Sequence, residues 1–110
     1  MTEAQILPIL SAWNDAMREC EERMDQLAEI VGPLVDRPLG DAIYRVMGAY
    51  TKTVADLIGW SYDTLEAWWN EHQLGGRPMK IGFCGEPMRT ISTIEDLAAF
   101  IAEDLARGEG

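Results

Sequence analysis

Residues 60–74 read WSYDTLEAWWNEHQL and hold three of the chain's four tryptophans and its only histidine. Gly59 precedes this stretch and Gly75-Gly76 follow it, and glycine commonly ends a helix. Ser61 and Asp63 are both suitable N-caps. The stretch is therefore predicted to form a helix that is capped by one of these two residues and ends at the glycine pair.

A helix over these residues gathers its large side chains on one face, because they are spaced three and four apart. So much rigid apolar area must be buried in the fold or against a partner, and the sequence leaves both possibilities open. The residues on this face are Leu65, Trp68, Trp69 and His72.

The composition is that of one soluble domain: 110 residues, 47% of them apolar and 25% charged. The net charge of −10 argues against direct binding to nucleic acid or to an anionic membrane. The N-terminus lacks the features of a signal peptide, and no stretch approaches the roughly 20 apolar residues of a membrane span. We expect a cytoplasmic protein.

Only residues 75–92 carry net positive charge, with three basic residues against Glu86. This segment could dock an acidic partner surface, or it could pair with the chain's own acidic helices. Together with the tryptophan face it gives a predicted partner-binding set of Trp68, Trp69, His72, Arg77, Lys80 and Arg89.

The first helix is predicted from a capping box of Thr2 and Gln5, with Pro8 either kinking the helix or starting it afresh. It ends at Gly32-Pro33. Apolar residues alternate at steps of three and four, as in a coiled-coil seam: Leu10, Trp13, Met17, Cys20, Met24, Leu27 and Val31. On the opposite face lie Asp15, Glu19, Glu22, Asp25 and Glu29, which form either a solvated surface or a row of phosphate-like charges.

A second helix is predicted after a loop over residues 32–40, with Asp41 as its cap and a similar seam of Ile43, Met47, Tyr50, Val54 and Leu57. The two seams indicate an antiparallel helical hairpin. The first spans about 32 Å and the second about 21 Å at 1.5 Å per residue. The tryptophan helix, a second copy of the chain, or both must cover the surplus. We expect a homodimer that buries either Leu10 and Trp13 or Leu27 and Val31.

After Gly76 the apolar period changes to two, which predicts a β-hairpin with strands at residues 79–84 and 88–91. A two-residue type II′ loop beginning at Gly85 would set Phe83 opposite Met88. A three-residue loop would set Ile81 opposite Ile91, and the sequence does not decide between these registers.

The last helix is predicted from a capping box, formed either by Ser92 with Glu95 or by Thr93 with Asp96. Phe100 lies off the apolar stripe of this helix and is expected to cover the hairpin. The stripe itself consists of Ile94, Leu97, Ala98, Ile101 and Leu105.

The sequence carries no catalytic signature, and we expect neither an enzyme nor a bound metal or cofactor. Cys20 and Cys84 with one histidine cannot form a standard zinc set. His72 could act as a general base, but its place in the last helical turn favours a helix-end or packing role. Cys84 beside the hairpin turn is a candidate reactive thiol, against the alternative of an inert one.

Residues 65–71 (LEAWWNE), the glycine pair, the glycine-containing hairpin and residues 91–101 (ISTIEDLAAFI) resemble the end of some small phage- and prophage-encoded proteins. The resemblance is confined to residues 65–101. It implies a phage or prophage origin and carries no functional residue across.

We predict an α+β fold dominated by helices, in a single domain over residues 1–110. A long helical hairpin occupies residues 1–60, and a tryptophan-rich helix, a β-hairpin and a C-terminal helix occupy residues 61–110. The predicted function is that of a small acidic, non-enzymatic protein-binding module of phage or prophage type. The alternative is an acidic nucleic-acid mimic that inhibits a host DNA-binding or defence enzyme through the acidic face of the first helix.

Overall fold

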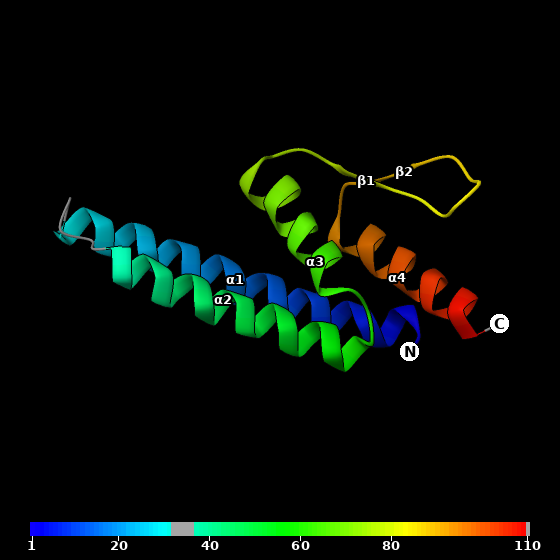
Figure 1. Cartoon of the computed structure of the whole chain (residues 1–110), viewed down its shortest axis with the longest axis horizontal. Coiled ribbons are helices and arrows are strands. Elements are labelled where there is room, and N and C mark those ends of the chain that lie inside the picture. The colour runs from blue at the N-terminus through cyan, green and yellow to red at the C-terminus, as the bar shows by residue number, and fades with distance from the viewer. Residues whose placement is uncertain (32–36, 110) are drawn as a thin grey trace.

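A computed structural model of the chain describes residues 1–31 and 37–109 and confirms a predominantly helical α+β fold. In Figure 1, α3 and α4 lie on one side of the paired helices α1 and α2, and the β-hairpin lies beyond them. The elements in chain order are α1 (Glu3–Val31), α2 (Arg37–Ile58), α3 (Tyr62–Trp68), the π-helix η2 (Trp69–Leu74), β1 (Met79–Ile81), β2 (Arg89–Ile91) and α4 (Ile94–Glu109).

The predicted capping box begins α1: the Gln5 amide donates to Thr2 Oγ1 over 3.3 Å, and the Thr2 amide donates to Gln5 Oε1 over 2.8 Å. The helix runs through Pro8 as one element, so a fresh start at Pro8 is wrong. Pro8 is the sixth residue of α1 and lies past the first four unpaired amides, so the helix continues without the one hydrogen bond that an amide at this position would donate to the Ala4 carbonyl.

The second helix begins at Arg37 rather than after Asp41, so the predicted cap at Asp41 is wrong. Pro38 falls in the first helical turn, where proline is tolerated because its missing N–H would have no partner there. The rest of the predicted loop, residues 32–36, lies outside the described residues.

The face of α2 that packs inward differs from the predicted seam, since Tyr50 and Leu57 are exposed. Thr51 is buried, and its hydroxyl accepts a 3.0 Å hydrogen bond from the Trp13 indole and donates one to the Met47 carbonyl. A satisfied threonine can replace an apolar core residue, and small side chains leave room for the indole. The buried row of α2 is Met47, Thr51, Ala55 and Ile58.

The surplus length of α1 is covered within one chain. Ile6 and Leu10 are fully buried where α4 packs on α1. The Trp13 ring meets the edge of Trp69, with 6.3 Å between ring centroids. Leu10 and Trp13 are therefore unavailable to a second copy, which corrects one of the two patches from which a dimer was predicted.

Of the two candidate caps of the tryptophan stretch, Ser61 is the one that begins the helix, and its hydroxyl accepts a 3.2 Å hydrogen bond from the Thr64 amide. Gly59, with φ of 80°, ends α2 in the left-handed region that glycine adopts most readily. From Trp69 the helix widens into a π-helix, which the sequence pattern did not predict. A wider turn changes the direction of successive side chains, and both Trp68 and Trp69 are buried.

Both predicted hairpin registers are wrong, because Met79 pairs with Ile91 and Ile81 pairs with Arg89. This register places the apolar pair Met79 and Ile91 in the core and leaves Phe83 in the connecting loop, where its ring stacks on Phe100 at 4.8 Å. The Glu86 amide donates to the Phe83 carbonyl across a turn whose third residue is Gly85, with φ of 83°. A positive φ at that position is typical of a type II turn.

Thr93 caps α4, since its hydroxyl accepts a 3.0 Å hydrogen bond from the Asp96 amide, which selects the second of the two predicted capping boxes. Phe100 covers the hairpin as predicted. The predicted stripe is the packed face: Leu97, Ala98 and Ile101 are buried, and Ile94 and Leu105 are half-buried.

Candidate functional site

The structure places the predicted tryptophan face inside the molecule. Trp68 has no exposed surface and Trp69 is 4% exposed, so neither indole is free to meet a partner in this fold. The His72 imidazole stacks flat on Trp68, with 4.3 Å between ring centroids. The Nδ1 atom of His72 lies 3.0 Å from the side-chain amide nitrogen of Gln73, and an amide does not transfer protons to or from a histidine. This arrangement supports packing at His72 rather than general-base chemistry.

Two of the three predicted basic residues are paired within the chain. Arg77 donates to Glu71 over 3.0 Å, and Arg89 forms a two-bond ion pair with Glu103 of α4. Lys80 is exposed and forms no ion pair among the described residues. Arg77 and Arg89 therefore follow the second of the two predicted alternatives, in which the basic segment pairs with acidic residues of the same chain.

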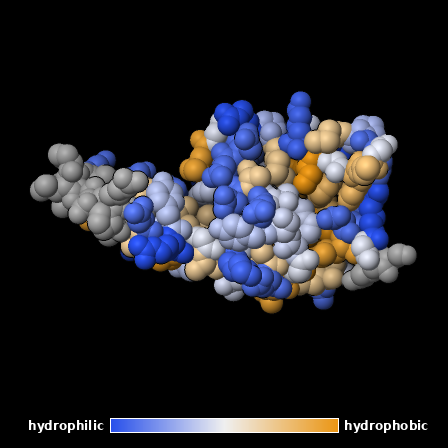
Figure 2. Space-filling view, viewed as in Figure 1, coloured by the Kyte–Doolittle hydropathy of each residue, from blue (hydrophilic) through white to orange (hydrophobic). Residues whose placement is uncertain are grey.

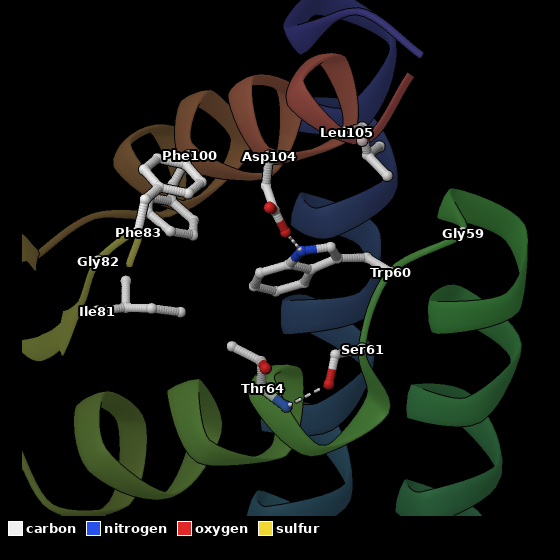
Figure 3. Close-up of a pocket in the computed structure, with 11 residues that line it drawn as sticks. Gly59, Trp60, Ser61, Thr64, Ile81, Gly82, Phe83, Phe100, Asp104 and Leu105 are labelled. Atoms are coloured by element: carbon white, nitrogen blue, oxygen red, sulfur yellow. Dashed lines mark hydrogen bonds between the residues drawn. The ribbon is translucent and has the colours of Figure 1, made fainter. Parts of the chain in front are cut away.

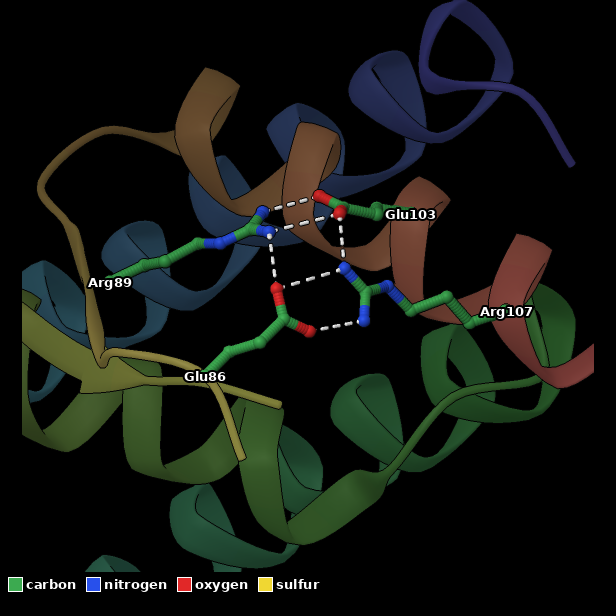
Figure 4. A network of polar contacts seen from close by, with 4 residues as sticks. All are labelled: Glu86, Arg89, Glu103 and Arg107. Carbon is green, nitrogen blue, oxygen red and sulfur yellow. Dashed lines mark hydrogen bonds and ion pairs between the residues drawn. The ribbon is translucent and has the colours of Figure 1, made fainter. Parts of the chain in front are cut away.

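Four charged side chains join the hairpin to α4 (Figure 4). Arg107 bonds both Glu86 of the hairpin loop and Glu103, and its Nη2 lies 2.9 Å from Glu103 Oε1. Arg89 bonds Glu103 and lies 4.0 Å from Glu86. The guanidinium of Arg107 also lies 3.8 Å from the centroid of the Phe83 ring. The network holds the hairpin loop against the last turns of α4.

These arginines lower the pKa of the two carboxyl groups. Hydrogen bonds from Arg89 and then Arg107 lower the pKa of Glu103 to about 2. The hydrogen bond from Arg107 is the largest cause of the lowered pKa of Glu86. Both acids therefore remain charged at pH values where an ordinary glutamate has taken up a proton.

We expect this network to make the stability depend on acid. A carboxyl whose pKa is lower in the folded state stabilises the fold above its unfolded pKa, and this contribution is lost as the pH falls through the folded value. For Glu103 the loss should occur between its ordinary pKa of 4.5 and about 2. Glu103→Gln should melt earlier than wild type at pH 7, and the two proteins should converge near pH 2. Melting temperatures measured by circular dichroism from pH 2 to 7 would check this, and parallel curves would contradict it.

A hollow of about 530 Å³ opens between the α2–α3 junction, the β-hairpin and α4 (Figure 3). Trp60 extends into it, and the indole donates a 2.6 Å hydrogen bond to Asp104 of α4. Phe83 and Phe100 stack on the opposite wall. Hydrophobic residues lie among hydrophilic ones at this end of the molecule in Figure 2.

The lining of the hollow offers apolar surface and one carboxylate. The Ser61 hydroxyl already caps α3, and one oxygen of Asp104 already accepts from Trp60. Among the described side chains, those that line the hollow do not include a histidine, a cysteine or a second acid to pair with Asp104. The chemistry available here is therefore contact and charge recognition, without a nucleophile beside a base.

The acidic face of α1 is exposed along its whole length. The Glu19 carboxylate accepts from Arg23 over 2.7 Å, which neutralises one of its charges locally. The exposed residues are those predicted: Asp15, Glu19, Glu22, Asp25 and Glu29. Their arrangement agrees with both a solvated surface and a row of phosphate-like charges.

A feature that the sequence analysis missed is a row of exposed side chains on α2, which we call the α2 stripe: Val46, Tyr50, Thr53 and Leu57. Spacings of four, three and four place them on one face of the helix. Val46 is 44% exposed, Tyr50 42% and Leu57 62%. The sequence contained one sign of this exposed row: Val46 is apolar but does not fit the predicted seam. It lies one position from Met47, which is buried.

The remaining predicted features carry little chemistry. Cys84 is exposed, and Cys20 is half-buried with a thiol pKa raised chiefly by burial. In residues 1–31 and 37–109, no three His, Cys, Asp or Glu side chains come together as metal ligands would. None of the helices in those ranges combines the length and the apolar character needed to cross a membrane.

Comparison with known proteins gives no relative to set beside this geometry. No family model matches the chain, and neither the curated proteins nor the solved structures contain a match.

Proposed function

We propose that this protein is a small, acidic, non-enzymatic protein-binding module and that the α2 stripe is its binding surface. The observation that carries the proposal is the exposure of Val46, Tyr50 and Leu57 in one row of a 22-residue helix. Single exposed apolar residues are common, but a row on one face is typical of a surface that another protein covers. We place the module in the cytoplasm, and in that of the host if a phage or prophage encodes the chain.

Placement of α2 supports the choice of surface. In Figure 1 the elements α3 and α4 lie on one side of the α1–α2 pair, and the other side of the pair is uncovered in this view. The inward face of α2 is occupied by the contacts of Thr51 with Trp13 and Met17 of α1. A partner can therefore cover the stripe without any rearrangement of the core.

The second candidate is the acidic nucleic-acid mimic. It is favoured by the exposure of all five acids along α1 and by the net charge of −10. A mimic binds basic proteins through charge, so its binding should weaken steeply with salt. A partner held by apolar contacts should depend on salt much less.

One experiment separates the two candidates. The tagged chain is used to capture proteins from a bacterial lysate that has been mixed with an untagged copy of the same chain. Leu57→Glu should capture at most about one-tenth of the amount of protein that wild type captures, because the substitution places a charge in an apolar contact. A triple variant, Glu19→Gln with Glu22→Gln and Glu29→Gln, should retain it.

The opposite result, with loss in the triple variant and retention in Leu57→Glu, would favour mimicry. Equal capture by wild type and both variants would contradict both candidates. The control is Gln26→Glu, which adds the same charge as Leu57→Glu at an exposed position on α1, away from the stripe.

A further inference from the structure

We infer that the protein covering the α2 stripe is a second copy of this chain, packed antiparallel to the first about a two-fold axis. The inference rests on the proposed function, since it names the protein that the stripe binds. This dimer differs from the one predicted from the sequence, because its contact lies on the outer face of α2, whereas the predicted contact lay on α1.

The stripe is complementary to itself, which a two-fold interface requires. If the axis passes between Tyr50 and Thr53, antiparallel packing sets Val46 of one copy against the partner's Leu57. It also sets Tyr50 against the partner's Thr53. Each pair then occurs twice, and each joins a larger side chain to a smaller one. Helices in contact interdigitate best with such pairs.

Charges beside the stripe favour the same arrangement. Arg45 and Asp56 each precede a stripe residue by one position, so they lie on the same edge of it, and both are exposed. In an antiparallel two-fold pair that edge of one copy lies beside the same edge of the other. Arg45 then comes within reach of the partner's Asp56, again twice. Such flanking pairs set the orientation of packed helices.

Among the described residues of one chain, Asp56 pairs only with Lys52, over 2.8 Å, and about two thirds of each side chain is exposed. An exposed pair of this kind contributes little stability, so it does not prevent Asp56 from meeting a second cation. Arg45 forms no ion pair with another described residue. Within the part of the chain that the structure describes, the edge of the stripe therefore carries a cation without an ion-pair partner and an acid that can be shared.

The area available points to a weak dimer. With the axis between Tyr50 and Thr53, only residues 45–58 of the two α2 helices lie opposite one another, a length of about 21 Å at 1.5 Å per residue. Two packed helices are about 20 Å wide, which gives about 800 Å² in total over both copies. This lies below the size of standard stable interfaces, so we expect a weak dimer with a dissociation constant on the order of 10 µM. Two copies that each carry −10 repel one another, and 0.15 M salt is needed to screen this repulsion.

The test is the molar mass of the full chain in 0.15 M salt, measured by sedimentation equilibrium from about 1 µM to 1 mM, a range that brackets the expected constant. Wild type should rise from 12.3 kDa toward twice that mass. Leu57→Glu should remain at the lower mass, and Gln26→Glu should behave as wild type. Arg45→Glu should weaken the dimer about three- to tenfold, consistent with the modest strength of exposed ion pairs. Addition of Asp56→Arg to that variant should restore it.

A constant mass of 12.3 kDa over the whole range would overturn the inference. In that case the proposed function would survive if Leu57→Glu released a different captured protein, and it would fail if the variant released none. A dimer that Leu57→Glu leaves intact would also overturn the inference, since the contact would then lie elsewhere. Restoration by the charge exchange is the result that a general loss of folding could not imitate.

Discussion

Replacing Trp68 with alanine is expected to lower the free energy of unfolding by about 3–5 kcal/mol, because a large ring with no exposed surface leaves a cavity behind it. The same range is expected for Trp69→Ala, since that ring packs on Trp13. Small domains have about 5–15 kcal/mol in total, so either change should leave a substantial part of the population unfolded at 37 °C. Urea denaturation followed by circular dichroism would measure both.

The matched control is Leu74→Ala, in the same π-helix but 55% exposed, for which we expect a change within about 0.5 kcal/mol. If Trp68→Ala and Trp69→Ala instead kept the wild-type stability and lost only a binding activity, the tryptophan face would be a docking surface. The assignment of these rings to the core would then be wrong.

The second large effect is expected at Ile101, which is fully buried on the packed face of α4. Ile101→Ala should cost about 2–5 kcal/mol through the cavity that it leaves. Since α4 covers the N-terminal part of α1 within one chain, the cost should be the same at low and at high protein concentration. Denaturation midpoints at about 1 µM and 100 µM, on either side of the expected dimer constant, would test this.

The control for this variant is Ile30→Ala, the same substitution at a residue that is 81% exposed, with an expected change within about 0.5 kcal/mol. A cost at Ile101 that disappeared at high concentration would mean that a second copy, rather than α4, supports this end of α1. That result would restore the originally predicted patch at Leu10 and Trp13.

The sequence by itself determined where most helices begin and end. Thr2 with Gln5 caps α1 as predicted, Ser61 and Thr93 are each one of two candidate caps that the sequence offered, and Gly59 ends α2. Each of these signals depends on hydrogen bonds or backbone angles within about four residues, so a single sequence contains all of the information. The apolar stripe of α4 was predictable for the same reason.

Part of the candidate site could also be read from the sequence. The acidic face of α1 is exposed as its spacing predicted, and the pairing of Arg77 and Arg89 within the chain was one of two alternatives. The choice between those alternatives depended on Glu103, which lies 14 residues from Arg89 along the chain. No local pattern connects those two residues.

Only the tertiary structure decided which face of α2 packs inward. The sequence pattern predicted that Tyr50 and Leu57 would face inward, because they are apolar. The fold buries Thr51 instead, because its hydroxyl accepts a hydrogen bond from the indole of Trp13, which lies 38 residues away along the chain. The stacking of Phe83 on Phe100 is likewise a contact between residues distant in the sequence, and it occurs together with the observed hairpin register. Contacts between distant residues fix a helix's rotation and a strand's register, and the α2 stripe is exposed as a consequence of that rotation.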